Sequence, residues 1–180
     1  MNNIVVNEEV HLAKISHNDT ARLQEIANDS VLRRNMWDTF PFPYTLDDAT
    51  WFINNCAEEW EKEYGERNYW IYVNNVYAGN LGFHQKKKWR ELYNVHLWYW
   101  LWREYRGKGY MTGIVKKVLL MIDEEIPDRH RVYAKVVSSN PGSRKVLEKN
   151  WFSLEWTERE SQLFEWERYD MWILSLVNNT

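Results

Sequence analysis

The stretch "LWYWLWREYRGKGYMTG", residues 97–113, decides the fold. Its first half continues an alternating pattern that predicts a long β-strand over 91–102. Its second half opens a helical pattern over 108–126, whose apolar face holds Ile114, Val115, Val118, Leu119 and Ile122. A turn between a strand and a helix exposes the first backbone N–H groups of the helix, which have no intrahelical partner and carry partial positive charge. Such a turn can bind phosphate oxygens through its backbone.

The composition of the turn fits this interpretation. Gly107 and Gly109 allow close approach of the backbone or a positive φ, and Arg106 and Lys108 would add charge beside a bound anion. The spacing matches neither the GxxxxGK[ST] phosphate loop nor the GxGxxG dinucleotide fingerprint. The residues of this turn fit equally well with a second interpretation. In that case it is a solvated basic turn that binds no phosphate, and its glycines are needed only for the backbone geometry.

The rest of the chain alternates between strand and helix patterns. Helices are expected at 17–29, 46–64 and 140–150, and further strands at 10–16, 69–73, 76–85, 131–137, 152–160 and 163–177. Asn18 or Asp19 is a possible cap for the first helix and Thr45 for the second. The apolar positions of the second helix are Trp51, Phe52, Cys56 and Trp60. This order predicts one mixed α/β sheet domain over residues 1–180.

Composition excludes several classes of protein. The net charge of −3 lacks the positive excess of a nucleic-acid-binding domain. Cys56 is the only cysteine, so no intramolecular disulfide can form, and we expect a buried structural thiol in a cytoplasmic protein. No apolar run reaches the roughly 20 residues of a membrane span, the N-terminus does not resemble a signal peptide, and no spacing predicts a metal site.

Two motifs resemble one known family. "YWLWREYRGKGYMT" is similar to the acetyl-CoA-binding motif [RQ]-x-x-G-x-[GA] of the GNAT acetyltransferase superfamily, with Met111 at the last position as in its RimJ/RimL branch. "SSNPGSRKVLEKNWF" resembles the branch pattern N-x-x-S-x-x-V-x-E-K-x-G-F. "DTFPFPYTLDDA" and "ERYDMWILSLV" also resemble that branch, so the resemblance covers most of the chain in the right order.

The resemblance implies a mixed, twisted sheet of about six to seven strands, with helices on both faces and strands that splay apart at the cofactor site. It implies that the chain binds acetyl-CoA without a metal. The backbone around Trp100 and Leu101 is expected to pair with the pantetheine arm, and Asn140 to contact the amides of that arm. The pyrophosphate is expected at the backbone of Arg106, Gly107, Lys108, Gly109, Tyr110 and Met111.

Acetyl transfer to an amine requires a neutral amine, a stabilised oxyanion and a protonated or hydrogen-bonded leaving thiolate. A backbone N–H between Tyr99 and Leu101 can serve the oxyanion. Ser143 is the candidate for the thiolate, by its place in the branch motif, and the alternative is an ordinary helix serine. His96 is the candidate base, at a position where relatives often carry Glu, and the alternative is a strand histidine in the core or at an edge.

Other side chains are weaker candidates for proton transfer. His84 and Glu91 are the weaker candidates for the general base. Tyr133 and Tyr169 could act as acids, although buried tyrosines usually anchor a sheet.

The chain has twelve tryptophans and only seven glycines. Five of the tryptophans stand where relatives usually carry glycine: Trp98, Trp102, Trp151, Trp156 and Trp166. A bulky residue at a position that needs positive φ is strained. One hypothesis is that some of these residues are glycine in the native protein, because its source reads UGA as glycine. The alternative is that the tryptophans are real and narrow the acceptor site, in which case Trp98 crowds the catalytic strand.

The expected function is N-acetyltransfer from acetyl-CoA to a primary amine, most of all a protein N-terminal α-amino group. A small-molecule amine is the alternative acceptor. Two other classes stay open, a non-catalytic acyl-CoA-binding domain and an aromatic-rich module that stacks sugars or bases. No nucleic acid or membrane partner is expected, and the protein is expected to be a monomer or a homodimer.

Overall fold

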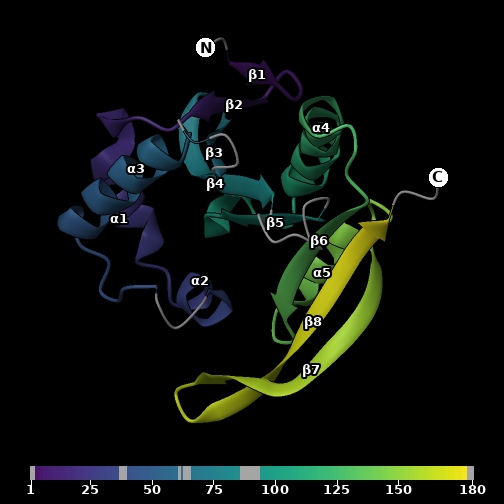
Figure 1. The fold of residues 1–180 in the computed structure, drawn as a ribbon. Helices are drawn as coiled ribbons and strands as arrows, with labels where there is room; N and C mark the ends of the chain where they lie inside the picture. The colour runs from purple at the N-terminus through teal and green to yellow at the C-terminus, as the bar shows by residue number, and fades with distance from the viewer. Residues whose placement is uncertain (1–2, 37–39, 61, 63–65, 86–93, 178–180) are drawn as a thin grey trace. The chain divides into compact units, whose positions relative to one another are not determined.

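The computed structural model describes residues 3–36, 40–60, 62, 66–85 and 94–177 (Figure 1). The chain divides into two compact units. The first unit comprises Met1–His84 and Tyr99–Tyr110, and the second comprises Gln85–Trp98 and Met111–Thr180. The strand β5 (Asn94–Leu101) contributes residues to both units.

The first unit is built on antiparallel strands paired in the order β1 (Ile4–Val5), β2 (Val10–Lys14), β3 (Arg67–Val73) and β4 (Val76–Gln85). The hairpin predicted at β3 and β4 is confirmed. Its two-residue turn consists of Asn74 and Asn75, at φ of 50° and 61°. Asparagine tolerates this left-handed conformation better than most residues, which suits it to the turn of a tight hairpin.

The helices of the first unit are the 3₁₀ turn η1 (His17–Asp19), α1 (Thr20–Ala27), α2 (Ser30–Asn35) and α3 (Leu46–Trp60). Figure 1 shows α1 and α3 side by side, and residues of the two helices are in contact. The predicted cap of α3 is confirmed as a reciprocal capping box. Thr45 Oγ1 accepts a hydrogen bond from Asp48 N (3.2 Å), and Asp48 Oδ2 accepts one from Thr45 N (2.8 Å).

The predicted apolar stripe of α3 is wrong at Trp51, which is 67% exposed. The buried residues of α3 are Ala49, Ile53 and Cys56, of which Cys56 was part of the predicted stripe. They follow an i, i+4, i+7 pattern and place small and β-branched side chains in the core. Burial raises the pKa of the Cys56 thiol and keeps it protonated, as expected of a structural cysteine.

The first helix also differs from its prediction. Asp19 occupies the N-cap position of α1 but makes no capping hydrogen bond, because its carboxylate accepts a hydrogen bond from the Tyr72 hydroxyl. Neither β1 nor α2 was predicted, since two-residue strands and six-residue helices have too little periodicity to be recognised.

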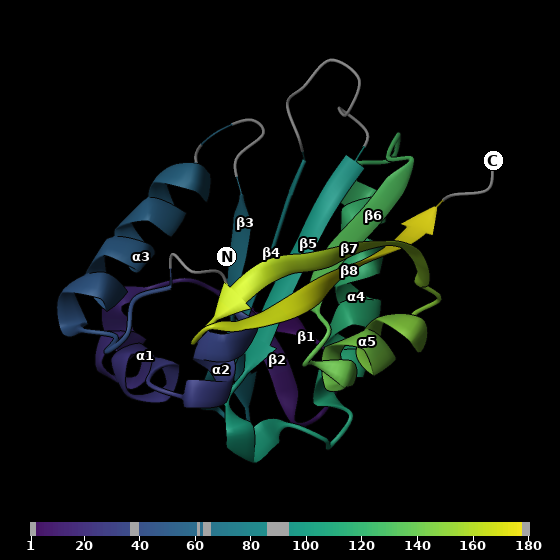
Figure 2. The same ribbon diagram turned by 90° about the horizontal axis from the view of Figure 1, so that it is seen from below.

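The second unit contains the strands β5, β6 (Arg131–Val137), β8 (Glu167–Val177) and β7 (Ser153–Phe164), paired in that order. The β5–β6 pair is parallel, and the others are antiparallel. Figures 1 and 2 show β7 and β8 running alongside each other as a long hairpin. The strands form one eight-stranded, mostly antiparallel sheet, in which β5 is common to both units. The predicted sheet had about six to seven strands and did not include β1.

Helices α4 (Tyr110–Glu125) and α5 (Pro141–Glu148) complete the second unit, except that the first residue of α4 falls in the first unit. The apolar face predicted for α4 is buried at all five of its positions. The end of α5 is tied to α4, because the Asn150 amide donates to Thr112 O (3.2 Å). Among the described residues, no helix is long and apolar enough to cross a membrane.

Candidate active site

The turn singled out in the sequence lies between β5 and α4. Leu101 ends β5, the 3₁₀ turn η2 covers Arg103–Tyr105, and α4 begins at Tyr110. Gly107 and Gly109 have φ of 76° and 85°, and a Cβ on either would meet open space. These glycines are therefore required for their backbone conformation and not for close packing. The turn from 107 to 109 is exposed and leads into the unpaired N–H groups of a 16-residue helix.

The strand that leads into this turn is fixed by β4. A Cβ on Gly79 would lie 2.2 Å from the carbonyl oxygen of Trp100, so only glycine permits the close approach of β4 to this part of β5. Trp102 N then donates to Ala78 O at 2.8 Å. The Trp100 side chain is buried edge-on against Tyr77, with ring centroids 6.5 Å apart. The backbone of Trp100 and Leu101 therefore enters the turn from a rigid position.

The basic residues of the turn have different surroundings. The Arg106 guanidinium is directed toward the protein, since its Nε donates to Leu101 O (2.7 Å) and its Nη2 lies 3.4 Å from Asp29 Oδ2. Burial lowers the pKa of Arg106, and the Asp29 carboxylate opposes that effect. Lys108 is exposed, with its Nζ 5.9 Å from the centre of the Tyr105 ring. Of the two charges expected beside an anion, that of Arg106 is therefore already balanced by a carboxylate.

The second motif lies in the second unit, at the start of α5. Asn140 is the N-cap of this helix, and its Oδ1 accepts a hydrogen bond from Ser143 N at 3.1 Å. Pro141 occupies the first turn, where a missing N–H costs nothing. Both Asn140 and Ser143 are half-buried. The motif therefore has a structural role as a helix cap, which is compatible with a further role for the remaining polar atoms.

His96 lies in the second unit on β5, directly opposite Tyr133 of β6. The two rings are 5.0 Å apart between centroids and tilted by 33°. The parallel register between β5 and β6 ends at this pair, although both strands continue beyond it. The guanidinium of Arg131 also lies over Tyr133, at 4.6 Å, and is paired with Glu155. His96 is half-buried.

The weaker candidates are dispersed. His84 lies on β4 in the first unit, and Glu91 lies outside the described residues. The Tyr169 hydroxyl donates to Glu167 on the same strand, which indicates a structural role. Asp29 was not predicted, although an Asp immediately before Ser30 is an N-cap signal that could have revealed α2.

Two of the five unusual tryptophans have left-handed backbone. Trp151 follows α5 at φ of 62°, and Trp166 is the second residue of the β7–β8 turn at φ of 71°. Their side chains are 71% and 93% exposed. Neither Trp98 nor Trp102 has positive φ, and the Trp102 ring lies 4.2 Å from the guanidinium of Arg22.

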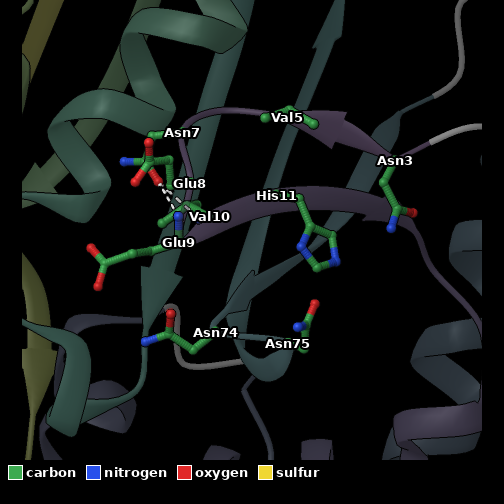
Figure 3. Close-up of a pocket in the computed structure, with 9 residues that line it drawn as sticks. All are labelled: Asn3, Val5, Asn7, Glu8, Glu9, Val10, His11, Asn74 and Asn75. Atoms are coloured by element: carbon green, nitrogen blue, oxygen red, sulfur yellow. Dashed lines mark hydrogen bonds between the residues drawn. The ribbon is translucent and has the colours of Figure 1, made fainter.

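A separate hollow of about 410 Å³ lies in the first unit, between the β1–β2 loop and the β3–β4 turn (Figure 3). Asn7 Oδ1 accepts hydrogen bonds from Glu9 N (2.9 Å) and Val10 N (2.8 Å), so the loop is held by its own side chain. The hollow contains none of the predicted catalytic or cofactor-binding residues. In the part of the chain that the structure describes, no cluster of histidine, cysteine or carboxylate side chains could hold a metal ion.

Comparison with known proteins confirms the family resemblance. The family profile described as "Acetyltransferase (GNAT) domain" matches residues 9–153. A curated relative from Bacillus subtilis (strain 168), named "Putative ribosomal N-acetyltransferase YdaF", is 24% identical over 176 residues, which cover 96% of this chain and 93% of the relative.

Solved structures share the fold at lower identity. RimL, a ribosomal L7/L12 α-N-protein acetyltransferase in complex with coenzyme A, has a TM-score of 0.86 at 18% identity over 98% of both chains. MccE, the microcin C7 self-immunity acetyltransferase in complex with acetyl-CoA and AMP, has a TM-score of 0.80 at 20% identity, over 96% of this chain and 94% of its own. These likenesses confirm the predicted fold class.

Proposed function

Since this chain belongs to the GNAT acetyltransferase family, we propose that it transfers the acetyl group of acetyl-CoA to the α-amino group at the N-terminus of a protein. The family makes it an acetyltransferase, and the choice of acceptor is the proposal. The proposed acceptor is supported by the names of two relatives, RimL and YdaF, which refer to ribosomal protein acetylation.

The observation that carries the acetyl-CoA part of the proposal is the exposed turn between β5 and α4. Its two left-handed glycines and the first N–H groups of α4 offer a concentration of backbone donors, which is what a pyrophosphate needs. The open space around both glycines fits close approach of such a group. Within the turn, Lys108 is exposed and can add charge, whereas Arg106 is already paired.

In the proposed mechanism, the amine attacks the thioester carbonyl directly. His96 accepts the proton that the amine loses, and a backbone N–H between Tyr99 and Leu101 stabilises the oxyanion. Ser143 donates a hydrogen bond to the leaving thiolate, and Asn140 supports both the α5 helix and the amide-bearing arm. The half-burial of His96 and Ser143 fits groups that must be both held and reachable.

The experiment is a measurement of free CoA release with a panel of N-terminal peptides, comparing wild type with Ser143→Ala. We expect thiol release with peptides whose α-amine is free and none with the same peptides acetylated. Ser143→Ala should lower kcat, while Ser161→Ala in the hairpin serves as a control. Equal turnover by wild type and Ser143→Ala would remove Ser143 from the mechanism.

A second candidate function is acetylation of a small-molecule amine. The likeness to MccE, solved with acetyl-CoA and AMP, favours it. The same panel distinguishes the two acceptors if aminoacyl nucleotides and polyamines are included. A non-catalytic acyl-CoA-binding domain would bind acetyl-CoA but release no CoA with any amine.

Residues 1–180 are proposed to act as one acetyltransferase domain in the cytoplasm, as a monomer or a homodimer. Cys56 is the only cysteine of the sequence, which supports a reducing compartment.

A further inference from the structure

The Arg106 side chain links two parts of the first unit that are far apart in sequence. Its Nε donates to Leu101 O (2.7 Å), so the guanidinium closes the five-residue connection between the end of β5 and the exposed turn. Its Nη2 faces Asp29 Oδ2 at 3.4 Å. Arg106 is therefore a structural tie for the turn, because its donors point into the protein.

Asp29 is suited to hold this tie. Its side chain is 7% exposed, and its two oxygens have separate partners. Oδ1 accepts the N–H of Leu32 (2.9 Å) as the cap of α2, and Oδ2 faces Arg106. A carboxylate that is nearly buried needs such partners, and removing its charge would take away the carboxylate that Arg106 faces.

The segment that carries Asp29 is itself braced. The Asn28 amide donates to Gln24 O and Tyr44 O, each at 2.8 Å, and its Oδ1 accepts from Tyr44 N at 2.8 Å. The junction between α1 and α2 is thus fixed to the segment before α3. A fixed junction can transmit its position to Arg106, whereas a mobile one could not.

We propose that Asp29 is a positioning residue for acetyl-CoA, which holds the 103–109 turn, through Arg106, in the conformation that binds the pyrophosphate. This inference rests on the proposed function, because it assigns the turn to the pyrophosphate. It assigns no contact between Asp29 and the ligand. It also explains why the arginine of the motif is directed away from the exposed turn, so that phosphate charge is met by backbone N–H groups and Lys108.

Asp29→Asn is the sharpest test, because the amide keeps the Oδ1 acceptor of the α2 cap and replaces the charged acceptor that faces Arg106 with an NH2 donor. We expect the Kd of acetyl-CoA, measured by titration calorimetry, to rise about tenfold, within the usual range of coupling between sites. The kcat at saturating acetyl-CoA should change by less than about twofold. Arg106→Met should give a similar rise, and the double variant should show no further rise, because the two residues act as one unit.

An acetyl donor without the pyrophosphate distinguishes loss of turn positioning from general damage to the active site. S-Acetylpantetheine lacks the pyrophosphate, so Asp29→Asn should leave its kcat/KM unchanged. The matched control is Glu160→Gln, which removes the carboxylate of the exposed Arg168–Glu160 pair of the β7–β8 hairpin and should leave the Kd of acetyl-CoA unchanged.

The results that would overturn the role of Asp29 differ from those that would overturn the proposed acetyltransferase function. An unchanged Kd in Asp29→Asn overturns the inference, and so does an equal loss with acetyl-CoA and S-acetylpantetheine. Wild-type protein that binds no acetyl-CoA overturns the proposed function itself. If Asp29→Asn does not fold, Asp29→Ser, which can still cap α2, is measured in its place with the same expected rise.

Discussion

The imidazole of His96 lies 5.0 Å from the ring of Tyr133, centroid to centroid, at the last pair of the parallel register between β5 and β6. Beyond this pair, β5 and β6 both continue, but the parallel pairing between them ends. Contact with the tyrosine ring restricts the orientation of the imidazole, as a positioned general base requires.

His96→Gln should therefore lower kcat by about 10² or more, the usual contribution of general base catalysis. The measurement is steady-state CoA release at saturating acetyl-CoA. His11→Gln is a matched control, because the His11 ring also lies against a tyrosine ring, that of Tyr72, at 4.9 Å between centroids. Equal losses in the two variants, or none in His96→Gln, would show that His96 is a structural histidine.

The Glu155 carboxylate makes the stability of the second unit dependent on pH. A hydrogen bond from Arg131 is the main cause of its lowered pKa, with a smaller contribution from the Ser175 hydroxyl. A carboxyl with a lowered pKa in the folded state stabilises the protein above its unfolded pKa, about 4.3 for Glu, and loses that stabilisation as pH falls through the folded pKa. The Tm of wild type should therefore fall more steeply below about pH 4.5 than that of Glu155→Gln. Parallel Tm curves for the two proteins between neutral pH and pH 3 would contradict this expectation.

Much of this architecture follows from the sequence. The α4 helix and the β3–β4 hairpin were predicted correctly, because a 16-residue amphipathic helix and an Asn-Asn turn are strong local signals. The turn at Gly107 and Gly109 was predicted for the same reason, since a strand, two glycines and a helix occur in one continuous stretch. Local patterns therefore predict most of the elements and the strand–turn–helix arrangement at the candidate site, but not the short β1 and α2.

The non-local contacts could not be predicted. Nothing in the sequence pairs Arg106 with Asp29, because the interaction depends on how α2 and the turn meet after folding. The spacing of Trp51 fits the apolar stripe of a helix, but its side chain is exposed, whereas the smaller Ala49 and Ile53 occupy the buried face. Side-chain size and tertiary packing decide between such alternatives, and a single sequence does not contain that information.

Trp151 and Trp166 have left-handed backbone, so we expect that replacing either with glycine stabilises the folded protein. Trp166 occupies the second position of a two-residue hairpin turn, and Trp151 follows α5 where Phe152 N donates back to Leu147 O (3.1 Å). Glycine is favoured at both kinds of position. Left-handed backbone costs a non-glycine residue about 1–3 kcal/mol, so each change to glycine should raise the free energy of unfolding by about 1 kcal/mol.

The matched control is Trp156→Gly. Trp156 is 65% exposed on β7 and does not have positive φ, so glycine there should destabilise the strand slightly. Urea unfolding followed by far-UV circular dichroism measures all three variants. A gain at position 156 equal to the gains at 151 and 166 would indicate that loss of tryptophan, and not backbone conformation, is responsible.

The left-handed backbone at positions 151 and 166 allows a test of whether the native protein contains tryptophan there. The hypothesis that UGA is read as glycine predicts glycine at 151 and 166 in protein purified from its natural source, where the backbone favours it. Peptide mass spectrometry of the native protein, together with the codons of the gene, tests this directly. UGG codons at both positions would end the hypothesis, and the strain would then be a real property of the protein.

The central claim is that this acetyltransferase modifies a protein N-terminal α-amine. The most direct measurement is tandem mass spectrometry of a peptide with both a free α-amine and an internal lysine, after incubation with acetyl-CoA and the enzyme. We predict one acetyl group, located on the α-amino nitrogen, and no product when that amine is blocked. Acetylation of the lysine alone, or modification of small amines but of no peptide in the panel, would contradict the claim.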